Sequence, residues 1–326
     1  MMKILVVLLM TLVVGCSTTD SGTMSAGGIT YALNSEGLKT LLNNANPGDT
    51  VHLDADGEFK GTFNIPSGVQ IEGNGAQIQA TDSAALILNA ITGDNTIRNL
   101  SINSEMGGIV AFEGNSAAHL VLENVTVRVE RGFGIATENL NLSINNVAIQ
   151  GPISGPDDPL LDELGEEIDG SEHAIIGLVS AFGSVDINDL SVSGIGGFGV
   201  ILYEALGSWK QGTVENCVGV SLLTERSQLE IDSVSISDGL AGRKIGFAMP
   251  SIGMIAADRS TVTTRNLSIQ RVREIGFIQS GSDTTHAGLN IQDSDWVGLV
   301  AIASDTHAGT LTSAAPESRI SSARGA

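Results

Sequence analysis

The sequence predicts an all-β protein built as one parallel β-solenoid, and three observations lead to this fold class. First, short segments of alternating apolar and polar residues recur along the chain, as in LVLENVTV (120–127) and LSINNVAI (142–149), and such alternation is typical of strands. Second, a polar residue interrupts each segment near its centre. Third, 42% of the residues are hydrophobic but only 4% are aromatic, so the core must be aliphatic.

The central polar residues mark a repeating corner between two strands. A sharp bend needs a residue near the left-handed region, which Asn tolerates best among residues with a Cβ, followed by Asp. The corner residues that we predict are Asn99, Asn124, Asn146, Asp189, Ser233, Asn266 and Asp293, at spacings of 25, 22, 43, 44, 33 and 27 residues. The repeat is therefore about 22 residues long, and each longer gap is either one unit with an insertion or two units. Stacked corners let side-chain amides hydrogen-bond from one turn to the next.

The first residues are a targeting segment rather than part of the fold. A short apolar run ends in Val13-Val14-Gly15-Cys16, which resembles a bacterial lipobox. The resemblance implies a signal peptide over residues 1–15, a lipid on the Cys16 thiol and a place in the bacterial cell envelope. Ser17 in place of Asp implies the outer membrane. An ordinary secretory signal followed by an accidental cysteine is the alternative.

The remaining chain divides into a tether, a solenoid and a tail. Residues 16–28 are small and polar and predict a flexible tether, whereas residues 29–305 carry the repeat. Within them, SEGLKTLLNN (35–44) has leucines at helical spacing behind a Ser cap, which predicts a helix that covers the N-terminal end of the stack. A turn then leads into a first strand, Thr50–Leu53. Residues 306–326 have little apolar alternation and predict a disordered tail.

The start of the solenoid also carries a family resemblance. ANPGDTV (45–51) and IPSGVQIEG (65–73) are similar to the first turns of proteins in the pectin-lyase-like superfamily. The resemblance covers residues 28–305 and implies a single-stranded right-handed parallel β-helix. It implies little about function, because that superfamily contains lyases, hydrolases, adhesins and other surface proteins.

Three segments interrupt the repeat and are the places where chemistry is expected. Residues 151–173 contain eight carboxylates and no Lys or Arg, residues 203–211 contain Trp209 and Lys210, and residues 238–251 contain Arg243 and Lys244. The first and third segments follow equivalent strands, so they are expected to project from the same side, about 14 Å apart if three turns separate them. An acidic wall would then face a basic one across a groove.

The family resemblance implies a chemical role for this groove. Polysaccharide lyases of the superfamily pair Ca²⁺-binding acids with an Arg or Lys that abstracts a proton next to a uronate carboxylate. By that resemblance, Lys210, Arg243 and Lys244 are candidate catalytic residues. Asp157, Asp158, Asp162 and Glu163 are candidate ligands for Ca²⁺, the one cofactor considered. The competing interpretation is a solvated acidic loop and an ordinary pair of surface cations.

Two single residues also have competing interpretations. Trp209 could stack on a sugar ring, or it could anchor its own loop. Cys217 lies on an apolar alternation with no His nearby in sequence, so we interpret it as a buried structural thiol rather than a nucleophile.

Composition limits the partners. The formal net charge of −21 repels nucleic acid. Anionic headgroups are repelled as well, so the Cys16 lipid is the expected contact with a membrane. The sequence therefore predicts a lipid-anchored envelope or surface protein whose solenoid has a structural or binding role, with polysaccharide as the expected ligand class. A polysaccharide lyase or glycoside hydrolase with a non-standard site is the alternative.

Overall fold

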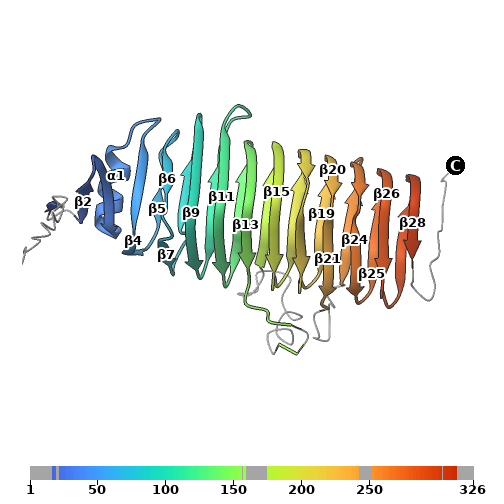
Figure 1. The fold of residues 1–326 in the computed structure, drawn as a ribbon. Helices are drawn as coiled ribbons and strands as arrows, with labels where there is room; N and C mark the ends of the chain where they lie inside the picture. Colours follow the sequence, from blue (N-terminus) through green and yellow to red (C-terminus); the bar gives the residue numbers. More distant parts are fainter. Residues whose placement is uncertain are drawn as a thin grey trace, which may run out of the picture.

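The protein is a parallel β-solenoid of about 11 turns, shown as a ribbon in Figure 1. The computed structural model describes residues 17–19, 22–155, 157–158, 175–241, 251–302 and 304–313. Apart from helix α1 (Ser35–Asn44), the regular elements of these residues are strands. This architecture confirms the fold class predicted from the repeat. The predicted signal peptide and Cys16 lie outside the described residues.

Each regular turn contributes strand segments to three walls of the solenoid. The first and second walls form an 18-stranded sheet, and the third wall is a separate 10-stranded sheet. The long strands, each of which supplies both the first and the second wall, are β4 (Thr50–Lys60), β9 (Asp94–Ser104), β11 (His119–Val129), β13 (Asn141–Gln150), β15 (Ser184–Ser193), β26 (Asp283–Gln292) and β28 (Asp305–Ser313).

In the other turns the two walls have separate strands. Those of the first wall are β6 (Gln70–Glu72), β17 (Leu206–Trp209), β20 (Gln228–Asp232) and β23 (Thr261–Arg265). Those of the second wall are β7 (Gln77–Ala80), β18 (Gly212–Glu215), β21 (Val234–Gly239) and β24 (Ser268–Val272).

The third wall has one strand from each turn. These strands are β5 (Phe63–Asn64), β8 (Leu86–Asn89), β10 (Gly107–Phe112), β12 (Gly132–Glu138), β14 (Ile175–Ala181), β16 (Phe198–Tyr203), β19 (Val220–Glu225), β22 (Ile252–Ala257), β25 (Ile275–Ser280) and β27 (Val297–Ile302).

The N-terminal end is closed by a hairpin and the helix. Strand β2 (Thr23–Ala26) pairs antiparallel with both β1 (Ser17–Thr19) and β3 (Ile29–Asn34). Strand β3 in turn pairs in parallel with β4. The segment expected to be a flexible tether therefore contains paired strands, because backbone pairing does not depend on the small polar side chains found there.

Helix α1 lies at the N-terminal end of the stack, as predicted (Figure 1), with Leu38 and Leu42 buried. Its N-cap, however, is Asn34 and not Ser35. The Asn34 Oδ1 accepts hydrogen bonds from the backbone N–H groups of Glu36 (3.1 Å) and Gly37 (3.0 Å). Ser35 instead bonds to the backbone of Lys60. The prediction of a Ser cap was wrong because the residue before it caps a helix equally well.

The predicted corner lies between the first and second walls. Asn99, Asn124, Asn146, Asp189, Ser233 and Asn266 all have a positive φ there, between 50° and 70°. The Asn124 Nδ2 donates to the Asn99 Oδ1 (3.0 Å), and the Asn146 Nδ2 donates to the Asn124 Oδ1 (2.7 Å). The prediction for Asp293 was wrong. The register places Gly288 opposite Asn266, whereas Asp293 follows Gln292, at the far end of the second wall.

Strand pairing resolves the long gaps between corners. Strand β13 pairs directly with β15, so the gap between Asn146 and Asp189 is one turn with an insertion. Strand β15 pairs with β17 and β18, which pair with β20 and β21, so the gap before Ser233 is two turns. Residues 203–211 are therefore not an insertion, since they contain a regular strand of the first wall.

The C-terminal boundary also differs from the prediction. Strand β28 pairs in parallel with β26, so the stack extends to Ser313 instead of ending at residue 305. The register shifts twice: β28 has an additional residue, Gly309, opposite the step from His286 to Ala287, and β26 has an additional residue, Gly288, between Ala287 and Leu289. Residues 314–326 lie outside the described part.

The outward faces of the walls differ in chemistry. In the third wall, the central outward position of each strand from β8 to β27 is aliphatic, and the register aligns these residues in one straight row. We call this row the outer aliphatic row; it consists of Ile87, Val110, Ala136, Val179, Ile201, Leu223, Ile255, Ile278 and Val300. Among the described residues, no helix has the length and hydrophobicity needed to cross a bilayer.

Glycines line the inner side of the third wall where each strand begins. From β10 to β27 the glycines of this row are Gly108, Gly134, Gly177, Gly199, Gly253, Gly276 and Gly298, with Ser221 as the exception. A Cβ on Gly177 would lie 2.5 Å from the carbonyl oxygen of Gly199 and 2.7 Å from the Val192 Cγ1. The close stacking of turns therefore depends on the absence of a side chain here.

We expect Gly177→Ala to lower the free energy of unfolding by about 1–3 kcal/mol, because a backbone carbonyl cannot move aside as a flexible side chain can. Urea denaturation measures this change. Gly93→Ala is the matched control, since the nearest atom to its added Cβ is 3.6 Å away. Equal stability of the two variants would contradict the role assigned to the glycine row.

A second prediction concerns His286, which is buried in β26. Its Nδ1 shares a hydrogen bond with the Thr264 Oγ1 (2.7 Å), and its ring meets that of Phe277 edge-on. Burial lowers the pKa of His286 from 6.5 to about 4. The unfolded chain therefore binds more protons between these values, so the stabilising contribution is complete above pH 6.5 and is lost as the pH falls.

We expect the wild type to lose about 2–3 kcal/mol more unfolding free energy than His286→Gln between pH 7.5 and pH 4.5. The comparison removes the contribution of the many carboxylates, which titrate in both proteins. Equal losses in the two proteins would show that His286 is not held neutral by burial.

Candidate functional site

The residues predicted to form a site do not assemble into one in the described part of the chain. Lys210 is exposed on the first wall, where its Nζ lies 3.5 Å from the Asp186 Oδ1. The two insertions leave from a different corner, after β13 and β21 of the second wall. Lys210 therefore lies on a different wall from the points at which the insertions begin. Arg243, Lys244, Asp162 and Glu163 lie outside the described residues.

The acids at the start of the first insertion have a local structural role. Asp158 is buried and accepts hydrogen bonds from both the backbone N–H (2.8 Å) and the hydroxyl (2.9 Å) of Ser154. Asp157 is exposed. In the part of the chain that the structure describes, His, Cys, Asp and Glu form no group of three or more that could hold a metal ion.

Trp209 and Cys217 are both core residues. Trp209 is fully buried, and its Nε1 donates to the carbonyl oxygen of Gln211 (2.7 Å). The suggestion that it stacks on a sugar was wrong, because its segment is a regular strand that points Trp209 inward. Cys217 is fully buried in the core, as expected of a structural thiol, and burial raises the pKa of its thiol to about 12.

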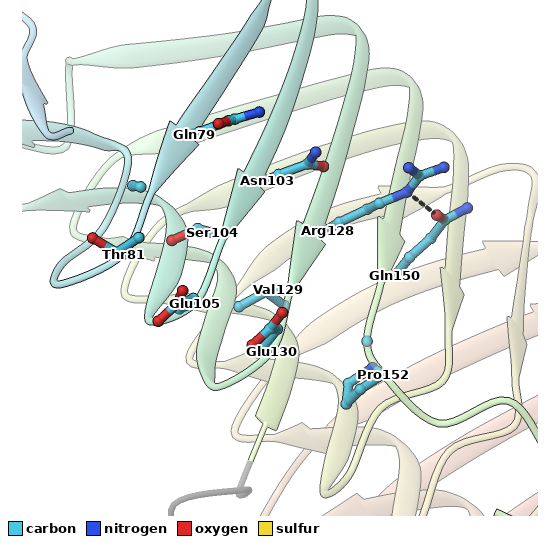
Figure 2. Close-up of a pocket in the computed structure, with 12 residues that line it drawn as sticks. Gln79, Thr81, Asn103, Ser104, Glu105, Arg128, Val129, Glu130, Gln150 and Pro152 are labelled. Carbon is cyan, nitrogen blue, oxygen red and sulfur yellow. Dashed lines mark hydrogen bonds between the residues drawn. The ribbon is translucent and has the colours of Figure 1, made fainter. Parts of the chain in front are cut away.

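The described residues do form a groove elsewhere, on the outer side of the second wall. It has a volume of about 540 Å³ and crosses strands β7, β9, β11 and β13. Figure 2 shows the row Gln79, Asn103, Arg128 and Gln150 projecting from successive strands. These side chains lie side by side because residues paired in register occupy the same position on neighbouring strands.

The far side of the groove is formed where the chain leaves the second wall. Thr81, Glu105, Glu130 and Pro152 line it on successive turns. Figure 2 shows Glu105 and Glu130 as neighbours, as expected from the pairing of Ser104 with Val129. The acidic insertion begins at this edge, since Gly151 and Pro152 belong to the groove.

The groove combines amides with a few balanced charges. The Arg128 Nε donates to the Gln150 Oε1 (2.8 Å), which fixes the guanidinium along the row. The Arg131 Nη2 lies 3.9 Å from the Glu105 Oε2. Because these charges offset one another, the groove differs from the strongly acidic average of the chain. It offers donors and acceptors in one line, as an uncharged polyhydroxyl ligand requires.

The same polar row continues beyond the groove along the whole second wall. Its further members are Ser193, Glu215, Ser237, Gln270 and Gln292. A parallel row two residues earlier consists of Gln77, Ser101, Thr126, Ala148, Ser191, Thr213, Ser235, Ser268 and Asn290. Of the residues in these two rows only Arg128 and Glu215 are charged. We call the two rows together the polar face.

Sequence reasoning missed the polar face, although a signal was present. Segments such as LSINS, VTVRV and LSIQR repeat a small hydroxyl residue and then a larger polar residue at the two outward positions. The candidate catalytic and metal-binding residues all come from segments that are predicted to interrupt the repeat, whereas the groove is formed by the repeat itself.

Comparison with solved structures found distant similarity to an alginate lyase, a bacteriophage tailspike protein and an exopolygalacturonase. An alginate lyase from Paenibacillus sp. str. FPU-7 is 12% identical and superposes with a TM-score of 0.39, over 86% of this chain and 98% of its own. Tailspike protein 3 of bacteriophage CBA120 is 11% identical with a TM-score of 0.33, over 89% and 59%.

A family 28 exopolygalacturonase from Yersinia enterocolitica is 10% identical with a TM-score of 0.29, over 89% of this chain and 82% of its own. No protein-family model and no curated protein sequence matches the chain. The function therefore has to be argued from the residues of the groove and the polar face.

Proposed function

We propose that this chain is a lipid-anchored protein of the bacterial envelope whose solenoid binds a polysaccharide along the polar face. The observation that carries the proposal is that amide and hydroxyl side chains, interrupted only by Arg128, Glu215 and Ala148, line the second wall of a chain with a net charge of −21. Amides and hydroxyls both donate and accept hydrogen bonds, as sugar hydroxyl groups do. The ligand class that fits best is a polysaccharide with few acidic groups, because a polyanion would be repelled.

The shape of the wall supports an extended ligand. Equivalent side chains recur at each turn, about 4.8 Å apart, so a long chain can make the same contacts many times. Each contact is weak, but many linked contacts give useful affinity. The groove at Arg128 would give one end of this surface a deeper and more specific binding site.

A second candidate function is glycoside hydrolysis in the groove. Glu105 and Glu130 lie on neighbouring turns, so their backbones are about 4.8 Å apart. Paired carboxylates at such short range are the catalytic equipment of many glycoside hydrolases. The lyase alternative has less support, because Lys210 lies on the first wall.

We expect Arg128→Ala to weaken polysaccharide binding about tenfold, since it removes a charged donor from the groove. Affinity electrophoresis against neutral glucans, mannans and galactans, with alginate and polygalacturonate as acidic probes, measures this. Arg265→Ala is the matched control, because it removes the same charge from the exposed end of β23 on the first wall. No binding to any neutral polymer, or equal effects of both variants, would contradict the proposal.

The same samples test the hydrolase candidate. New reducing ends that appear with the wild type and disappear with Glu105→Gln and Glu130→Gln would establish hydrolysis. Binding without product favours the purely binding role.

The anchor has its own test. We expect Cys16→Ser to abolish incorporation of labelled fatty acid and to release the chain from the membrane fraction, because the thiol is the proposed attachment point. Cys217→Ser is the control, since that buried thiol cannot be acylated in the folded chain. Membrane retention of Cys16→Ser would contradict lipid anchoring.

A further inference from the structure

The third wall has an outward surface that is unusual for a protein of this charge. The outer aliphatic row runs from β8 to β27, and all of its members except Ala136 are partly exposed. The row three residues earlier is also apolar, with Phe133, Ile176, Phe198, Val220, Ile252, Ile275 and Val297, and Phe133 is 37% exposed. The outer aliphatic row and this earlier row form a continuous apolar strip along the solenoid axis. The row two residues later is a mixed border, in which Phe112 (38% exposed) and Ile302 (50%) alternate with polar residues such as Glu138 and Glu225.

The strip has the dimensions of an interface. Eight spacings of about 4.8 Å between nine strands make the strip with its mixed border about 38 Å long, and five residue spacings of about 3.3 Å make it about 17 Å wide, which gives about 650 Å². Specific interfaces bury about 600–1,000 Å² on each partner.

The border of the strip is polar, as the rim of an interface is. Next to Tyr203, the Arg226 guanidinium lies 3.4 Å from Glu204 and 2.5 Å from Asp258. The Arg226 Nη1 also donates to the Tyr203 hydroxyl (2.6 Å), and the guanidinium lies over the Tyr203 ring at 5.7 Å. Aliphatic side chains therefore occupy the centre and paired charges the edge.

The repeat of the strip indicates what fits it. Its side chains protrude at the spacing of the turns, so a partner must present ridges at the same spacing to pack along the whole length. A second copy of this chain has that spacing by construction, and its strip is equally long. A lipid surface fits less well, because the ion pairs at the edge would lose water and because the chain is strongly acidic.

We propose that two copies of this chain associate through their third walls, with the outer aliphatic rows packed face to face as in a β-sandwich. The polar faces of both copies then remain exposed. Because each copy has a charge of −21, the copies repel one another at a distance, and added salt strengthens the association by screening that repulsion. Binding driven by opposite charges would respond to salt in the opposite way.

Sedimentation equilibrium of the full chain carrying Cys16→Ser, from about 1 to 100 μM, tests the proposal. We expect a reversible dimer that tightens between 50 mM and 500 mM NaCl. Ile201→Glu should weaken it at least about tenfold, because a charge enters the centre of the interface. Leu206→Glu is the matched control: this residue is 56% exposed on the first wall, and the substitution should change the dissociation constant less than twofold.

Circular dichroism and thermal unfolding check that Ile201→Glu folds, and Ile255→Gln replaces it if it does not. A chain that stays monomeric at 100 μM in 500 mM NaCl overturns the proposal. A dimer that persists in both variants places the contact elsewhere and overturns it equally. Monomers that bind phosphatidylcholine vesicles, with binding lost in Ile201→Glu, would make lipid the occupant of this face.

Discussion

The structure depends on hydrogen bonding between the backbones of successive turns in a fixed register. A single turn leaves the N–H and C=O groups of its strands unpaired. In each wall these groups pair with the equivalent strand of the neighbouring turn. Strand β11 illustrates this, since it is paired from His119 to Val129 with β9 and to Arg128 with β13. A shift by one residue would turn every inward side chain outward.

Fixed register gives each wall a uniform chemistry. The first wall carries isolated ion pairs such as Arg98 with Glu72, the second wall the polar face, and the third wall the outer aliphatic row. One protein thereby presents a polar surface and an apolar surface on different sides. The insertions lie at the corner between these two surfaces, which is also where the groove ends.

The length of the repeat, the corner between the first two walls and the aliphatic core could be predicted from the sequence, because each of these features recurs along the chain. Single positions were harder. Asp293 was assigned to the wrong corner because Asn, Asp and Gly all accept a left-handed backbone, so Gly288 left no distinctive signal. Trp209 was assigned to a loop because β17 is short and contains Gly207. The groove was missed because Gln79, Asn103 and Gln150 are ordinary surface residues until the register aligns them.

The most direct test of the account is a register-specific cross-link. Thr126 and Ala148 are paired across β11 and β13 on the polar face, so cysteines at these positions should form a disulfide rapidly on mild oxidation. Cysteines at Thr126 and Gln150 lie two residues out of register, about 8 Å apart, and should not. Cross-linking of the second pair in place of the first would contradict the stacking of turns on which the polar face and the outer aliphatic row both depend.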